Sequence, residues 1–167
     1  RINSVSDDPI GLSQVLDLNA SLGNLEQVEK NVNMGLSWLK GTENALDSVN
    51  ELILDVKTQT SQLINASMSA SEREDAIGSI NGIIDQIITL GNTQINGNYI
   101  FGGTDTDVLP LEYHGEDDPP WVSYNGNTIP FEIKTDETTT VQVGGVGSET
   151  FWDDEVEINL TNNTIIF

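Results

Sequence analysis

Apolar residues recur every seven positions through the first part of the chain, and this spacing predicts a long helix over residues 10–65. At ~1.5 Å per residue, such a helix extends over roughly 80 Å. A second apolar series runs beside the first and changes phase partway along, as a nearly straight helix does when it is measured against a 3.5-residue repeat. The first series is Leu18, Leu25, Val32, Leu39, Leu46 and Ile53, and the second is Leu22, Leu36, Val49, Val56 and Leu63.

The start and the interior of this predicted helix carry their own signals. Asp8 precedes Pro9, the arrangement of an N-cap residue followed by proline at the first helical position. Gly23, Gly35 and Gly41 each weaken a helix by up to ~1 kcal/mol. These glycines therefore indicate either close packing against another segment or a kink.

A second, shorter helix is predicted over residues 72–95. It follows a serine-rich turn, and Ser71 with Glu74 fits a capping box. A short loop between two long periodic helices predicts an antiparallel hairpin, in which the first apolar series faces the second helix. The opposing residues are expected to be Ile80, Ile84 and Ile87. Two helices cannot bury apolar stripes of this length alone, so a further helix is implied, and residues 96–167 cannot supply it.

Beyond Asn98 the apolar period becomes two, which is typical of strands. Asn125-Gly126 separates two alternating segments and predicts a β-hairpin, residues 139–143 alternate as a strand, and residues 156–167 predict a second hairpin. The expected fold class is therefore α+β: a long antiparallel helical hairpin followed by a small, mostly antiparallel β domain. We expect a helical rod domain over residues 1–98 and an acidic β domain over residues 99–167 at the far end of the rod.

Charge narrows the classes of partner. The chain carries 27 acidic and 6 basic residues, a net charge of -21. Binding to nucleic acid or to an anionic membrane needs clustered Lys and Arg, so neither partner is expected. The single basic residue after position 95 is Lys134, which indicates that the β part is mostly solvated. The absence of cysteine excludes disulfides and thiol chemistry.

Candidate catalytic and metal-binding residues are few. The only histidine, His114, lies in an acidic segment and is interpreted as a solvated loop residue. Paired carboxylates are adjacent in sequence, so they cannot face a substrate from two sides as glycosidase carboxylates do. Asp105 and Asp107, or residues 116–118, are an alternative as a weak calcium site. Residues 144–147 are interpreted as a flexible glycine turn with no helix after it. No catalytic residue, cofactor or metal site is predicted.

Two segments resemble the flagellin superfamily. The first is Arg1-Ile2-Asn3-Ser4 with Asp7-Asp8, followed by Pro9 and Gly11. The second is Leu90-Gly91-Asn92-Thr93-Gln94-Ile95-Asn96-Gly97-Asn98-Tyr99-Ile100-Phe101-Gly102-Gly103, whose Phe-Gly-Gly end is similar to the hook-associated branch of that superfamily. In this family both chain termini form an inner coiled coil, and a returning C-terminal helix completes the helical layer. The resemblance, specific over residues 1–109, implies that the present chain is a fragment without those parts.

The resemblance implies a structural adaptor that joins hook to filament in the bacterial flagellum by subunit packing, without catalysis. Two alternatives stay open: a flagellin filament subunit, and a surface module that binds a ligand or calcium through its acidic β part. The implied partners are the hook-side junction protein, flagellin and copies of the chain itself. The implied location is extracellular, after export without a cleaved signal peptide. Asp55 stands in a stretch where many flagellins carry a receptor-contacting arginine, so the chain departs there from the family's pattern for immune-receptor contact.

Assembly and packing are expected to depend on four groups of residues. The N-terminal signature, the first apolar series, the second helix and the Phe-Gly-Gly turn each contribute. In that turn Gly102 and Gly103 permit positive φ and Phe101 anchors the backbone. The residues are Arg1, Asn3, Asp7, Asp8, Leu25, Val32, Leu39, Leu46, Ile53, Ile84 and Phe101.

Overall fold

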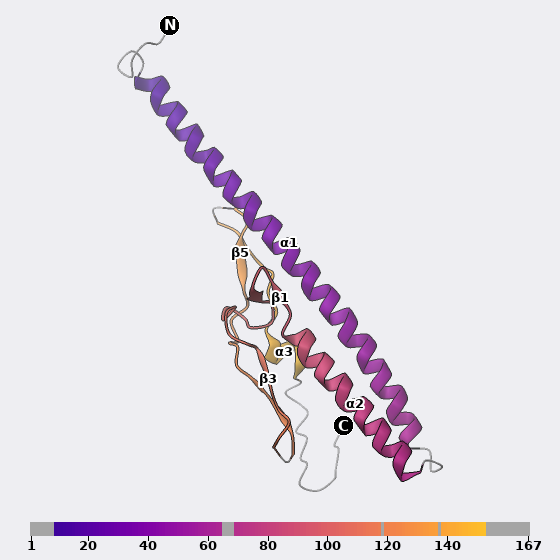
Figure 1. The fold of residues 1–167 in the computed structure, drawn as a ribbon. Coiled ribbons are helices and arrows are strands. Elements are labelled where there is room, and N and C mark those ends of the chain that lie inside the picture. Colours follow the sequence, from indigo (N-terminus) through magenta and orange to yellow (C-terminus); the bar gives the residue numbers. More distant parts are fainter. Residues whose placement is uncertain (1–8, 65–68, 118, 137, 153–167) are drawn as a thin grey trace.

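A computed structural model describes residues 9–64, 69–117, 119–136 and 138–152. Two long helices pack as an antiparallel pair, and small β-hairpins lie against the longer one (Figure 1). This arrangement confirms the predicted α+β class. The elements are α1 (Pro9–Leu63), α2 (Ala70–Gly91), β1 (Gln94–Ile95), β2 (Asn98–Tyr99), β3 (Leu111–His114), β4 (Trp121–Tyr124), β5 (Glu132–Lys134), β6 (Thr140–Gln142) and α3 (Gly147–Phe151).

Helix α1 has 55 residues and begins at Pro9, which confirms the predicted long helix. Its glycines divide into two kinds. A Cβ on Gly35 would meet the Ile133 side chain, and a Cβ on Gly41 would lie 2.9 Å from Ile95 Cδ1, whereas a Cβ on Gly23 would have nothing within 4 Å. Close packing therefore explains Gly35 and Gly41. The predicted cap at Asp8 lies outside the described residues.

Helix α2 begins one half-turn earlier than predicted. The capping box consists of Ser69 and Glu72 rather than Ser71 and Glu74: the Glu72 N–H donates to Ser69 Oγ at 3.3 Å, and the Ser69 N–H donates to a Glu72 carboxylate oxygen at 2.7 Å. These hydrogen bonds lower the pKa of Glu72. The helix also ends earlier, at Gly91, so its predicted extension to residue 95 is wrong.

The chain leaves α2 through a tight turn. Asn92 fixes this exit, because its amide accepts from the Leu111 N–H at 2.9 Å and donates to the Leu111 carbonyl at 2.8 Å. β1 and β2 then pair across Asn96 and Gly97, whose φ angles are 52° and 84°. Positive φ at both positions is the requirement of a type I′ hairpin turn, which Asn-Gly satisfies at little cost. The two-residue period therefore begins before Asn98.

The predicted hairpin at Asn125-Gly126 is wrong. β4 pairs with β3, antiparallel, from Leu111↔Tyr124 to His114↔Trp121. The local turn signal is overridden by long-range hydrogen bonds: the Tyr124 hydroxyl donates to the Phe101 carbonyl at 3.0 Å, and the Asn127 N–H donates to the Gly102 carbonyl at 3.1 Å. These bonds hold the segment after β4 against the Phe-Gly-Gly turn.

β5 and β6 form a further antiparallel pair, which confirms the predicted strand over residues 139–143 in its central part. Gly144 and Gly145 then pack against side chains instead of forming a flexible turn: a Cβ on Gly144 would lie 2.7 Å from Phe131 Cβ. Helix α3 follows directly, so the expectation that no helix follows these glycines is also wrong. The hairpin predicted over residues 156–167 lies outside the described residues.

The core forms where the β segments meet the middle of α1. Trp38 is 1% exposed and stacks on Phe131 at a ring-centroid distance of 4.5 Å. The prediction that the β part sits at the far end of the rod is therefore wrong, because it covers the centre of α1 (Figure 1). The division into domains at residues 98 and 99 stays a prediction. The buried cluster consists of Trp38, Ala45, Ile100, Phe101, Ile133 and Val143.

Candidate assembly surface

Two apolar rows run along α1, and only one of them is buried within the chain. The buried row has three- and four-residue spacing and includes Trp38, Ala45 and Val49, which are 1%, 3% and 7% exposed. Small residues in this row, such as Gly35 and Ala45, allow other segments to approach the helix backbone closely. The β segments and α2 therefore pack on this row.

The second row is left exposed, and we call it the outer seam. Its residues are also three, four or seven positions apart, so they form one stripe on a helix. The exposed fractions include 66% for Leu25, 46% for Leu39, 37% for Leu46 and 45% for Ile53. The outer seam consists of the exposed residues Val15, Leu18, Leu22, Leu25, Leu36, Leu39, Leu46 and Ile53, together with the half-buried Val32.

The first apolar series therefore lies on one face of α1, as its spacing predicts, but α2 does not cover that face. On α2, Ile83 is buried at 5% exposed, whereas Ile84 is 37% exposed. Of the three residues predicted to oppose the first series, Ile84 lies outside the contact, whereas Ile80 and Ile87 are half-buried beside Ile83. On α1 the buried row lies one residue before the predicted series, at Trp38 and Ala45 instead of Leu39 and Leu46. A role in assembly for these residues stays a prediction.

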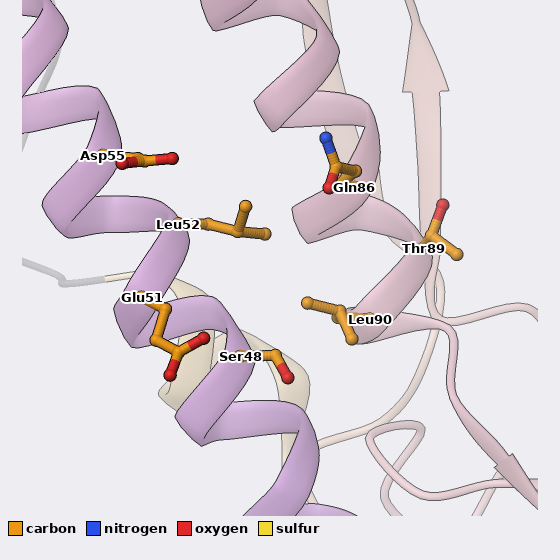
Figure 2. Close-up of a pocket in the computed structure, with 7 residues that line it drawn as sticks. All are labelled: Ser48, Glu51, Leu52, Asp55, Gln86, Thr89 and Leu90. Atoms are coloured by element: carbon orange, nitrogen blue, oxygen red, sulfur yellow. The ribbon is translucent and has the colours of Figure 1, made fainter.

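A polar groove lies between α1 and α2 (Figure 2). Its volume is about 630 Å³. Leu52 and Leu90 point toward each other across it, and Glu51 and Asp55 stand one turn apart on the α1 wall. On the α2 wall, the Thr89 hydroxyl already donates to the Asp85 carbonyl at 2.8 Å. The groove is thus lined by two carboxylates, two leucines and three uncharged polar side chains, without a nucleophile–base pair.

Phe101 is placed where its sequence context predicts. It is fully buried, meets Phe151 edge-on at a centroid distance of 5.2 Å, and precedes Gly103, whose φ is 68°. The Tyr124 hydroxyl donates to the Phe101 carbonyl, and burial raises the pKa of that phenol. Phe101 therefore anchors the turn between the helices and the β segments.

Sequence reasoning missed several residues that hold this turn. Asn127 accepts from the Thr104 N–H at 3.1 Å through its side chain, and a Cβ on Gly103 would lie 2.5 Å from the Asn127 carbonyl oxygen. Tyr124 and Asn92 bridge segments 23 and 19 positions apart. Only the clustering of Asn and Gly near Phe101 could have indicated them, because their partners are distant in sequence.

His114 is a strand residue, so its interpretation as a solvated loop residue is wrong. Its ring stacks on Trp121 at a centroid distance of 4.0 Å, and its Nε2 lies 3.1 Å from Ser123 Oγ. A nucleophile–base pair needs a third group that orients the base. Within the described residues, His114 has no such hydrogen bond at Nδ1. The stack of His114 on Trp121 is a cross-strand pair that stabilises the β3–β4 hairpin.

The remaining predicted positions add no chemical centre. Arg1, Asn3, Asp7 and Asp8 lie outside the described residues. In the part of the chain that the structure describes, no three His, Cys, Asp or Glu side chains gather closely enough to hold a metal ion. Among the same residues, no helix combines the length and apolarity that a bilayer span requires.

Comparisons with known proteins agree with this architecture. The family model described as bacterial flagellin N-terminal helical region matches residues 1–106. Flagellar hook-associated protein 3 of Salmonella typhimurium is 26% identical over 90% of the chain and 46% of its own length. Flagellin 1 of Proteus mirabilis is 26% identical over 94% of the chain and 40% of its own length. The chain thus spans less than half the length of these relatives.

A solved structure shares the fold. The crystal structure of FlgL from Xanthomonas campestris superimposes with a TM-score of 0.71 at 25% identity, over 77% of this chain and 41% of that one. The curated relatives are flagellar proteins by name, and neither name states a catalytic activity.

Proposed function

Because the chain belongs to the bacterial flagellin family, whose N-terminal helical region it matches, we propose that it is part of a structural subunit that joins the flagellar hook to the filament. The outer seam is the observation that carries this proposal. A helix with an apolar stripe exposed over several turns is incomplete until another helix covers it. Such a seam suits a subunit that works by packing and needs no catalysis.

The proposed partners follow from the same relatives. Hook-associated protein 3 and flagellin both resemble the chain at similar identity, so the whole protein is proposed to contact the hook-side junction protein, flagellin and copies of itself. Its proposed location is the extracellular flagellum, reached without a cleaved signal peptide. The net charge of -21 favours neither nucleic acid nor an anionic membrane as a partner.

A flagellin filament subunit is the second candidate, because Flagellin 1 matches a larger share of the chain than hook-associated protein 3 does. The two candidates differ in whether the protein polymerises. Purified full-length protein is therefore mixed with isolated hooks that carry the hook-side junction protein, and flagellin is added afterwards. A junction subunit binds the hook ends as a short cap and allows flagellin to elongate from it. Long filaments of the protein alone would establish the flagellin candidate instead.

A further inference from the structure

One side of the β3–β4 hairpin turns away from the core. Successive side chains of a strand point to opposite sides of a sheet. Leu111, which is 3% exposed, and the half-buried Tyr124 are paired across the two strands and face the core. The alternate positions therefore face solvent, and we call this surface the outward face. It is formed by Glu112, His114, Trp121 and Ser123.

Trp121 is held in place on the outward face, although its side chain is 50% exposed. The His114 ring stacks on it at a centroid distance of 4.0 Å, with an interplanar angle of 12°. The indole Nε1–H donates to Asp117 Oδ2 at 2.7 Å. Because His114 covers one face of the indole, the exposed part includes the opposite face. An aromatic ring that is already fixed loses little freedom when a ligand stacks on it.

The polar groups around this ring are acidic. Asp117 lies at the edge of the indole, since an indole N–H bond lies in the plane of the ring. Glu112 accepts from Asn125 Nδ2 at 3.0 Å. A carboxylate offers about four lone-pair positions, so both carboxylates keep capacity to accept further hydrogen bonds. Residues 111–124 include no Lys or Arg, and their acidic residues are Glu112, Glu116, Asp117 and Asp118.

These features favour a flat, cationic ligand. The face of an indole attracts cations, and carboxylates form strong hydrogen bonds with charged donors. A guanidinium group has both properties, because it is planar, stacks on aromatic rings and carries N–H donors around its edge. A sugar also stacks on an exposed indole, but it has no charge to complement the carboxylates. The outward face is therefore better matched to arginine than to a sugar.

A second copy of this chain is a poor source of that arginine. Two chains with a net charge of -21 each repel one another before contact. The chain carries only two arginines, Arg1 and Arg73. A basic segment of a different protein is attracted by the same charge, which raises its rate of association.

We propose that the outward face of the β3–β4 hairpin binds an exposed arginine side chain on a basic segment of another protein. The guanidinium stacks on the open face of Trp121 and donates a hydrogen bond to Asp117. Glu112 adds negative charge on the same face. This interaction is separate from the outer seam and does not depend on the proposed joining of hook to filament.

Nuclear magnetic resonance of the isotope-labelled 167-residue chain tests the proposal, because the indole N–H of Trp121 gives its own signal. Two short Gly/Ser peptides are titrated that differ only in their central residue. One carries arginine, and the other carries citrulline, which resembles arginine in shape but has no charge. Methyl glucoside is the third probe and represents a sugar. The arginine peptide should bind about tenfold tighter than the citrulline peptide, and tighter than the glucoside.

Variants of the chain identify the groups that recognise the arginine. Asp117→Asn removes the charge but keeps an oxygen that can accept from the indole, and it should weaken binding of the arginine peptide several-fold. Trp121→Leu, followed through the amide signals of β3 and β4, should remove the preference for arginine over citrulline. Glu132→Gln is the matched control, because Glu132 is an exposed carboxylate on β5, and it should keep the parent Kd. Unchanged amide spectra elsewhere confirm that each variant is folded.

Four results would overturn the proposal. The arginine and citrulline peptides could bind equally, or the glucoside could bind more tightly than both. Glu132→Gln could weaken binding as much as Asp117→Asn, which would indicate general attraction to an acidic chain. Finally, the Trp121 signal could shift as the chain itself is concentrated and stop doing so in Arg73→Gln, which would identify a second copy as the occupant.

Discussion

Neighbouring residues of α1, Ala45 and Leu46, give a direct test of which apolar row holds the chain together. Ala45 is 3% exposed and belongs to the buried cluster, whereas Leu46 is 37% exposed on the outer seam. Replacing each residue with aspartate introduces the same charge at adjacent positions of the same helix. The apolar spacing alone predicts that Leu46→Asp costs several kcal/mol. The structure predicts instead that Ala45→Asp costs more unfolding free energy than Leu46→Asp.

The expected magnitudes follow from burial. Ala45→Asp places an unpaired carboxylate in the buried cluster, which costs about 3–5 kcal/mol of unfolding free energy. Leu46→Asp loses only part of one leucine's burial, and this costs about 1–2 kcal/mol. At roughly 2–4 °C per kcal/mol for a chain of this size, Ala45→Asp should lower Tm by about 6–20 °C, and Leu46→Asp by about 2–8 °C.

Thermal and urea unfolding followed by circular dichroism at 222 nm measure both variants. Asn44→Asp is the matched control, because Asn44 is exposed one residue earlier on α1. It reports the cost of adding one negative charge to an acidic chain. A larger loss of Tm for Leu46→Asp than for Ala45→Asp would refute the assignment of the buried row.

Further predictions concern the turn, the pH response, calcium and cooperativity. Gly103→Ala should lower the unfolding free energy by about 1–3 kcal/mol, because φ is positive and a Cβ would crowd Asn127. Gly23→Ala should raise it by about 0.5–1 kcal/mol, because nothing lies within 4 Å of a Cβ at this helical position. Equal urea midpoints for the two variants would contradict both expectations. Burial raises the folded-state pKa of Tyr124. The contribution of its protonated hydroxyl to the free energy of unfolding is therefore complete below the ordinary pKa of 10.0 and is lost as pH rises through the raised pKa. When the unfolding free energy is measured at increasing alkaline pH, this decrease should be present in the parent chain and absent in Tyr124→Phe. Calcium at millimolar concentration should leave Tm unchanged; a clear rise would revive the calcium-module alternative. Tryptophan fluorescence and circular dichroism should report one common unfolding transition, because Trp38 and Phe101 share a core; two separate transitions would support independent domains divided at residue 98.

The helices were predictable because long apolar periodicity leaves few alternatives. The spacing predicts burial of the wrong row of α1 because leucine and isoleucine dominate a hydrophobic pattern. The row that contacts the rest of the chain contains the small residues Gly35, Gly41 and Ala45. Those residues matter through their small size, since Ile133 and Ile95 approach the helix backbone there. A pattern of hydrophobicity does not register close approach.

The β part was harder to predict, and its two Asn-Gly pairs show why. Asn96-Gly97 forms the tight hairpin turn, whereas Asn125-Gly126 does not. The difference comes from Tyr124, whose hydroxyl reaches the carbonyl of Phe101, 23 positions away. Local turn preference amounts to about 1 kcal/mol or less, so a few distant hydrogen bonds decide the outcome. The packing role of Phe101 was predictable, and its partners were not.

Seeded assembly by full-length protein with an altered outer seam shows whether this surface builds the junction. Leu39→Asp and Leu46→Asp change exposed seam positions while leaving the buried row intact. Electron microscopy of hooks mixed with the protein and then with flagellin counts capped hooks that elongate. The wild-type protein should cap hooks and seed filaments, and the seam variant, still helical, should lose most of this activity. Full seeding activity in a folded seam variant would contradict the claim that this surface builds the junction.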